Sequence, residues 1–221
     1  MNKKALKAKI TKALRKGIPA KKSALADLVP ESLTAGKAYE AYVLGLVCER
    51  LHIDEGFSLR LVGGTKIALK SSPGPINTSY PHIEVFQGTQ HIANIWTDIE
   101  FKALSATKSG KHPLSLGDYH EMDIAVVVPN AAARPTPDQV MLLVECKNTG
   151  YQKSLLREIL GIRRELSYLS HPSSTSFSTW PRSTVPADPP SCITVFSTDP
   201  NVLSYCGPGT TFGIDFFHEP L

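Results

Sequence analysis

With 221 residues, 42% of them apolar and 20% charged, the chain is suited to one globular domain with a small appendage, and not to a disordered or fibrous protein. Its formal net charge of +4 is unevenly spread, because nine of the 24 basic residues and none of the 20 acidic ones lie in residues 1–22. No run approaches the roughly 18–20 apolar residues of a membrane span, and neither a signal peptide nor a CxxC pair is present, so we expect a cytoplasmic protein without membrane contact or zinc.

The basic N-terminal segment has the apolar spacing of a helix. Between positions 3 and 16 one stripe recurs every three or four residues, formed by Leu6, Ile10, Ala13 and Leu14. We therefore predict a basic helical arm over residues 1–30, with a second short helix at 23–28, and one main domain over 31–221. A basic arm suits a polyanion such as nucleic acid. The same stripe would equally pack on the body, on a second copy in a homodimer or on a partner protein, and basic termini are often simply solvated.

Helices and strands alternate in the main domain. A helix is predicted from Leu33 to Leu51, with Thr34 as its N-cap, and a strand at 57–62 whose hairpin partner we place at 66–70 after Gly63-Gly64. Residues 171–191, with five prolines and many serines, are expected to form a long surface loop. The other predicted elements are strands at 82–86, 92–104, 124–128, 141–145, 192–196 and 211–217, a helix at 152–169 and a helical turn at 201–205. This order predicts an α/β fold with a mixed central sheet flanked by helices.

The most informative feature is the apolar run from Met141 to Val144, which leads directly into Glu145-Cys146-Lys147. Side chains alternate along a strand, so Glu145 and Lys147 share one face and Cys146 points to the other. A second apolar strand follows Asp123, and Asp123 therefore converges with Glu145 and Lys147 if the two strands pair. Two carboxylates beside a lysine suit a hard divalent cation and a water. A structural ion pair between Glu145 and Lys147 is the alternative.

Asp123 followed by Glu145-Cys146-Lys147 resembles the PD-(D/E)XK nuclease superfamily, which has the restriction-endonuclease-like fold. The resemblance covers residues 33–197 in layout and departs from the name pattern at Met122, which stands where proline is usual. It implies a nuclease that uses Mg²⁺, or Mn²⁺ in its place. Asp123, Glu145 and the Cys146 backbone carbonyl would be metal ligands. Lys147 would hold or deprotonate the attacking water and stabilise the developing charge.

The resemblance also implies a glutamate from the helix before the sheet. We expect Glu40 in this role, as a catalytic and metal-binding residue, because it shares a helix face with Leu44, whereas its competitor Glu49 lies near the helix end. Gln152 and Lys153 open the helix after the site and are candidates for contacting the substrate backbone.

The function implied is endonucleolytic cleavage of nucleic acid, DNA rather than RNA, in defence or in DNA repair and recombination. Two alternatives stay open. One is a nuclease subunit that is active only within a larger complex, and the other is a non-catalytic nucleic-acid-binding relative of the fold. Plasmid cleavage that requires Mg²⁺ and stops with EDTA separates an enzyme from a binding module.

Overall fold

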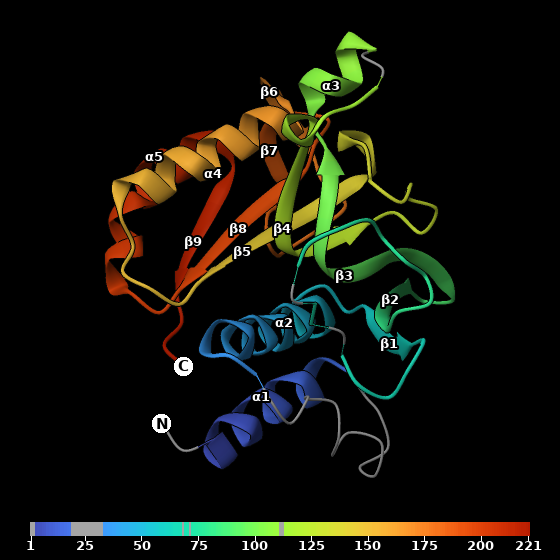
Figure 1. Cartoon of the computed structure of the whole chain (residues 1–221), viewed down its shortest axis with the longest axis vertical. Helices are drawn as coiled ribbons and strands as arrows, with labels where there is room; N and C mark the ends of the chain where they lie inside the picture. The colour runs from blue at the N-terminus through green and yellow to red at the C-terminus, as the bar shows by residue number, and fades with distance from the viewer. Residues whose placement is uncertain (1–2, 19–32, 68, 71, 111–112) are drawn as a thin grey trace.

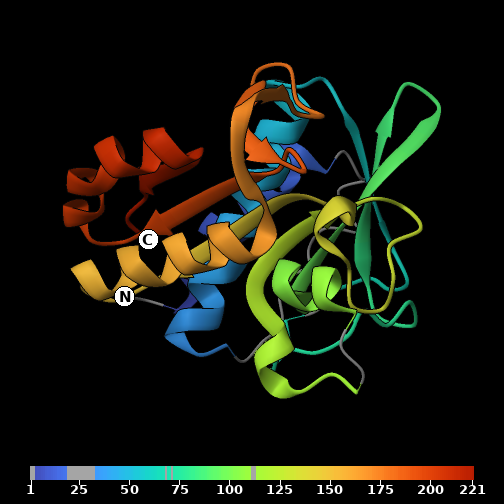
Figure 2. The same cartoon turned by 90° about the horizontal axis from the view of Figure 1, so that it is seen from above.

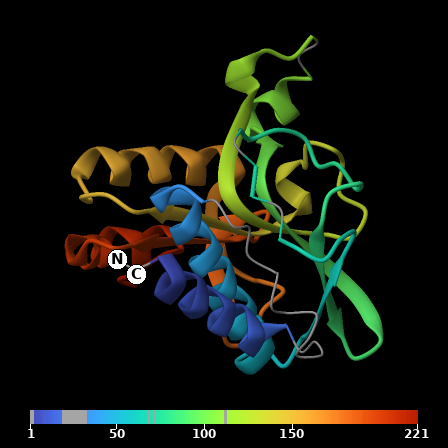
Figure 3. The same ribbon diagram turned by 60° about the horizontal axis from the view of Figure 1, so that its bottom comes forward.

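The computed structural model describes residues 3–18, 33–67, 69–70, 72–110 and 113–221. Within these residues a seven-stranded sheet lies between two layers of helices, which gives a mixed α/β fold (Figures 1 and 3). None of the helices in this part of the chain is both long and apolar enough to cross a membrane.

The strands pair in the order β1-β2-β3-β4-β5-β8-β9. Neighbours from β1 to β5 are antiparallel, whereas β8 runs parallel to β5 and β9 parallel to β8. The predicted mixed sheet is therefore confirmed. Its strands are β1 (Ser58–Val62), β2 (His82–Gln87), β3 (Gln90–Lys102), β4 (Tyr119–Val127), β5 (Val140–Lys147), β8 (Cys192–Ser197) and β9 (Ile214–His218).

Helices cover both faces of this sheet. On one face lies α2 (Ala35–Ile53), with α1 (Lys3–Gly17) packed on its outer side. The other face carries α4 (Lys153–Leu166) together with η3 (Pro200–Tyr205) and α5 (Cys206–Phe212). Crossovers between parallel strands are almost always right-handed, which brings α4 and α5 to the same face. Seen from above, β2 and β3 lie at the opposite end of the molecule from α5 (Figure 2), and α3 (Leu104–Ser109) follows β3.

Each face of the sheet has its own apolar core. Ile124 and Val144 point towards α2, whereas their strand neighbours Ala125 and Leu143 point towards α4, and all four are fully buried. A sheet covered on both faces explains why the sequence shows continuous apolar runs here and not an alternating pattern. Burial of each such leucine or isoleucine contributes about 1.5–3 kcal/mol to the hydrophobic stabilisation.

The first two helices pack closely and run in the same direction. Lys9 of α1 lies over the ring of Tyr42 of α2, and further along the Gly17 position of α1 meets Cys48. A Cβ on Gly17 would lie 2.2 Å from the Cys48 carbonyl carbon, so only glycine permits this approach. The apolar stripe of α1 is buried in this contact. Its residues Ile10, Ala13 and Leu14 are part of the same apolar core as the buried residues of α2.

The segment 66–70 is not the hairpin partner of β1, contrary to the prediction. Instead β1 pairs with β2, and among residues 66, 67, 69 and 70 none lies in a strand. Ile67 is buried in the α2 core, and the backbone N–H of Lys70 donates to Asp98 Oδ2 at 2.9 Å. This N–H is thus held by a side chain of β3 and not by a strand ladder.

The prediction of a long loop over residues 171–191 is also wrong. Strands β6 (Tyr168–Ser174) and β7 (Thr184–Asp188) form a separate antiparallel pair. Between them, Trp180 is buried, and the carboxylate of Glu55 accepts the backbone N–H groups of Ser178 and Trp180 at 2.6 Å each. Composition favoured a loop, but contacts with a residue far away in the sequence order this segment.

Some predicted boundaries hold and others move. The Thr34 side chain accepts the Lys37 N–H and caps α2 as predicted, and the turn at 201–205 is confirmed as η3. The strand predicted at 211–217 begins only at Ile214, because α5 continues to Phe212 and ends at Gly213, which has a φ of +70°. The helix predicted at 23–28 lies outside the described residues.

Candidate metal centre

The candidate site lies where β4 and β5 stop pairing. Their ladder ends with Ile124 opposite Val144, after which β4 continues beside β3 and β5 beside β8. Asp123 and Glu145 are the next residues beyond this point, and the Cys146 backbone N–H donates to Asp123 Oδ2 at 2.7 Å. The register therefore brings the two acids of the sequence motif together.

A third acid, Asp98, reaches the same point from β3. The β3–β4 ladder pairs Thr97 with Ile124 and Ile99 with Met122, which leaves Asp98 opposite Asp123. Met122 and Ile124 belong to different cores although they are two residues apart, so the alternation of β4 is broken between them. Asp98 has a left-handed φ of +51°, a conformation that costs a non-glycine residue about 1–2 kcal/mol. This irregularity allows both aspartates to point towards α2.

Glu40 completes the group from α2. One carboxylate oxygen each from Glu40, Asp98 and Asp123 lies within 4.8 Å of the others, and we call these three residues the acidic cluster. Magnesium binds oxygen at about 2.1 Å, so ligands on opposite sides of the ion are about 4.2 Å apart. The upper limit of 4.8 Å on the cluster's oxygen separations is compatible with this distance. Carboxylate oxygens are also the donors that Mg²⁺ and Mn²⁺ prefer.

Asp98 was not identified from the sequence, although a signal was present. It stands within the apolar stretch Ile95-Trp96-Thr97-Asp98-Ile99 and is only 5% exposed. A buried aspartate inside a core strand is rare unless it has a partner or a ligand.

Lys37 supplies positive charge to the cluster. It lies one turn before Glu40 on α2, and its Nζ is 2.6 Å from Glu40 Oε2 and 2.5 Å from Asp98 Oδ1. Burial opposes the charge of Lys37, but the hydrogen bonds to Asp98 and Glu40 outweigh it and raise the lysine pKa above its usual value. Lys37 is therefore an ammonium in this structure.

Two carboxylates of the cluster, those of Glu40 and Asp123, resist ionisation. Burial raises the pKa of Glu40 to about 7, against the opposing effect of Lys37. Burial, together with repulsion from Glu145, raises the pKa of Asp123 to about 7. A bound cation would favour the ionised form of both acids, so such a site is prepared to exchange protons for metal near neutral pH.

Glu145 and Lys147 form a close pair on the α4 side of the sheet. The Nζ of Lys147 is 2.6 Å from Glu145 Oε1 and 3.8 Å from Glu158 Oε1. These residues line a narrow space under α4 with Tyr151, whereas Cys146 packs against the α2 core. In this structure the Glu145 carboxylate faces Lys147 and is not part of the acidic cluster.

The charge of Lys147 limits what it can do. Burial opposes that charge, but Glu145 outweighs burial and raises the lysine pKa above its usual value. Burial also raises the pKa of Glu145, although Lys147 opposes the shift. As an ammonium, Lys147 can hold a water or stabilise negative charge, but it cannot remove a proton.

The remaining predicted residues are not among the three acids of the cluster. Gln152 is the N-cap residue of α4 and Lys153 is its first residue, and both are exposed. Glu49, the competitor of Glu40, pairs with Lys16 of α1 at 2.7 Å. The roles of Gln152, Lys153 and the Cys146 carbonyl stay predictions.

The chain has no match among protein-family models, curated proteins or solved structures. Its function is therefore inferred from the chemistry of the site alone. That site combines four carboxylates and two ammonium groups at one break in the sheet, contributed by Glu40, Asp98, Asp123, Glu145, Lys37 and Lys147.

Proposed function

We propose that the chain is a divalent-metal-dependent endonuclease of the restriction-endonuclease-like fold, which hydrolyses phosphodiester bonds of DNA. The observation that carries the proposal is that the acidic cluster, on the α2 side of the sheet, and the Glu145–Lys147 pair, on the α4 side, both lie where β4 and β5 diverge. They are close enough for the charge of Glu145 to raise the pKa of Asp123. The arrangement of an antiparallel unit β3-β4-β5, followed by α4 and the parallel strand β8, supports the fold assignment. Defence against foreign DNA, or DNA repair and recombination, would suit such an enzyme.

The donors of the site fit a hard cation. The cluster offers carboxylate oxygens and no imidazole or thiolate, a set that suits Mg²⁺ with Mn²⁺ as a substitute. The acidic cluster would hold the ion, and Glu145 and the Cys146 carbonyl would be its neighbours on β5. When bound, the metal would supply Lewis-acid stabilisation of the phosphoryl oxygens and a water of lowered pKa.

The chain's own residues would do the rest. Lys147 is oriented by Glu145, and its ammonium would hold the attacking water and stabilise negative charge on the phosphoryl oxygens. The water would attack phosphorus and lose one proton, the bond from phosphorus to one sugar oxygen would break, and that oxygen would take up a proton from solvent. Glu145, whose pKa is raised by burial, would accept the proton of the water.

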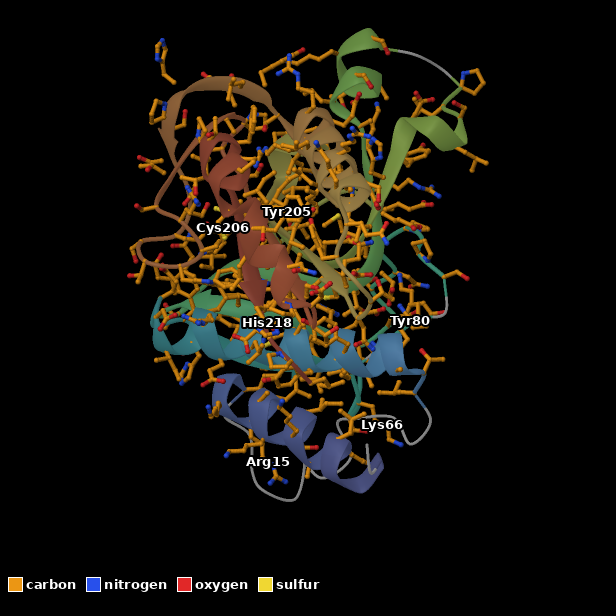
Figure 4. The ribbon with its side chains drawn as sticks, turned by 90° about the vertical axis from the view of Figure 1, so that its left-hand side faces the viewer. Arg15, Lys66, Tyr80, Tyr205, Cys206 and His218 are labelled. Carbon is orange, nitrogen blue, oxygen red and sulfur yellow. The ribbon has the colours of Figure 1, made fainter. Side chains whose placement is uncertain are left out.

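The outer face of α1 is the proposed contact for the DNA backbone. The helix contains no acid, and Lys12 and Arg15 are exposed, with Arg15 pointing away from α2 (Figure 4). Because the apolar stripe of α1 is buried against α2, Lys7, Lys12 and Arg15 lie together on its outer side, and we call these three residues the basic face, which suits a row of phosphates. Lys9 and Lys16 contact α2 instead. The same helix packs on α2, and α2 also carries Glu40, so α2 connects the basic face of α1 to the candidate site.

The test is cleavage by the purified full chain. Supercoiled, linear and single-stranded DNA and an RNA are incubated with Mg²⁺, with Mn²⁺ or with EDTA. We expect DNA to be cut with either metal and not with EDTA. Asp123→Asn should be inactive, whereas Asp138→Asn, a change of an exposed acid in the β4–β5 connection, should be fully active. DNA binding without cleavage under every condition would instead identify a non-catalytic binding protein.

A further inference from the structure

Lys37 is placed within the acidic cluster and not beside it. Its Nζ contacts Glu40 Oε2 at 2.6 Å and Asp98 Oδ1 at 2.5 Å, and the cluster oxygens lie within 4.8 Å of one another. An ammonium with two carboxylate oxygens at such distances takes the place that a metal ion would take between the same ligands.

The other oxygen of Asp98 is already engaged. Asp98 Oδ2 accepts the backbone N–H of Lys70 at 2.9 Å, so Oδ1 is the oxygen that Asp98 would offer to a metal, and Lys37 holds it. A cation bound to Asp98 Oδ1 and Glu40 Oε2 would lie within about 4 Å of Nζ, given oxygen distances of about 2.1 Å. Two positive charges this close in a partly buried site repel strongly. The metal and the ammonium therefore exclude each other.

Lys37 can leave the cluster without a change of the backbone. It is the third residue of α2, its side chain is 23% exposed, and its four-carbon stem can turn the ammonium into solvent. Without metal, the ammonium offsets the repulsion among three carboxylates in a small volume.

We propose that Lys37 sets the metal affinity of this site as a tethered competitor: its ammonium neutralises the acidic cluster in the metal-free protein and is displaced when the divalent cation binds. The inference rests on the proposed function, because it concerns the same site. If the ammonium holds its position about nine-tenths of the time, the apparent Kd for the metal is raised about tenfold.

The test compares Lys37→Met with Lys70→Met. Lys70 lies beside the same aspartate, but its Nζ donates to the backbone carbonyl oxygens of Asp98 and Pro75, at 3.3 and 3.5 Å, and lies over the ring of Tyr80. Both variants lose one positive charge near the cluster, and only the first empties the cation position. Mn²⁺ binding is measured by titration calorimetry and by electron paramagnetic resonance, so no cleavage activity is needed.

We expect Lys37→Met to bind Mn²⁺ about tenfold more tightly than the wild type, and Lys70→Met to change the Kd far less. Metal-free Lys37→Met should melt at a lower temperature, and Mn²⁺ should raise its Tm by more than it raises that of the wild type. Lys37→Gln is a second variant in case Lys37→Met folds poorly. Its side chain is neutral but still donates hydrogen bonds, and it should show the same gain in Mn²⁺ affinity.

Two outcomes would overturn the inference and point to different causes. If the wild type binds Mn²⁺ and both Lys37 variants bind it no more tightly, the competitor role is rejected. The nuclease proposal is not affected by that result. Absence of Mn²⁺ binding in the wild type and in every variant would reject the metal site and the proposed function with it.

Discussion

Asp98 and Asp123 face each other across β3 and β4, between the paired residues on either side of them, and both belong to the acidic cluster. Like charges directly opposite on a sheet are destabilising. Asp98 also has a φ of +51°, which is costly and persists only where the surrounding structure enforces it. The proposed cation-binding role would account for the opposed charges, because a bound metal would turn the repulsion between the two carboxylates into shared coordination.

Loss of either motif acid should stop cleavage. Asp123→Asn and Glu145→Gln are each expected to reduce DNA cleavage to background. The metal-free Asp123→Asn protein should be more stable than the wild type, on the order of 1 kcal/mol, because a buried charge that repels Glu145 is removed. Plasmid cleavage and calorimetric melting check this. Near-normal cleavage by either variant would reject the site assignment, and Asp138→Asn serves as the control for a lost surface charge.

Loss of the lysine should separate catalysis from metal binding. Lys147→Met is expected to lower turnover about 10²–10³-fold, the usual effect of removing one group that stabilises transition-state charge. Its Mn²⁺ affinity should stay within a few-fold of the wild type, because an ammonium is not a ligand. Titration calorimetry and single-turnover cleavage measure the two effects. A loss of Mn²⁺ binding as complete as in the Asp123 variant would contradict the role given to Lys147.

The stability of the metal-free protein should fall as pH rises. Burial raises the pKa of Glu40 to about 7 and that of Asp123 to about 7, whereas such acids titrate near 4 in an unfolded chain. Between about pH 4 and pH 7 the folded state therefore binds more protons than the unfolded state. Each group then lowers the free energy of unfolding by at most about 1.4 kcal/mol per pH unit, and the decline levels off about one pH unit above the folded pKa of about 7.

The measurement for this pH dependence is denaturant unfolding between pH 5 and pH 8, with EDTA and with Mg²⁺. The decline should be smaller in Asp123→Asn and Glu40→Gln, and Mg²⁺ should reduce it, because metal binding keeps the carboxylates ionised. Parallel pH profiles for the wild type and both variants would show that these acids are not perturbed as described.

The basic face of α1 should contribute to DNA binding through charge alone. Deletion of residues 1–22 is a poor test, because Ile10 and Leu14 are buried against α2 and their loss would lower the Tm. The combined variant Lys7→Gln, Lys12→Gln and Arg15→Gln keeps that packing. It should bind duplex DNA more weakly and reduce the log–log salt slope by up to about 2.7, which is about 0.9 per lost phosphate contact.

The control for the basic face is Arg157→Gln, a change of an exposed arginine on α4. Fluorescence anisotropy over a range of salt concentrations measures both the affinity and the slope. An unchanged slope in the triple variant, with an unchanged Tm, would assign α1 to packing only.

Several features of this protein follow from local sequence and were predicted from it. The apolar runs that lead to Val127 and into Glu145 indicated buried strands, because a strand covered on both faces has no polar side. The face shared by Glu145 and Lys147 follows from strand alternation, which depends on nearest neighbours only. The Thr34 cap and the inward side of α2 that carries Glu40 are likewise set within one or two helical turns.

Other features depend on segments that are distant in the chain. Asp98 enters the site for two reasons: the β3–β4 register places it opposite Asp123, and its own left-handed backbone conformation turns its side chain. Neither the register nor this conformation is encoded in the residues next to Asp98. Its contact with Lys37 joins residues 61 positions apart. The order of residues 171–191 likewise depends on the distant Glu55. Local preferences are decided by a residue and its neighbours, whereas the charge balance of a buried site depends on which distant groups share its small volume, and that is settled only when the sheet and the helices have packed.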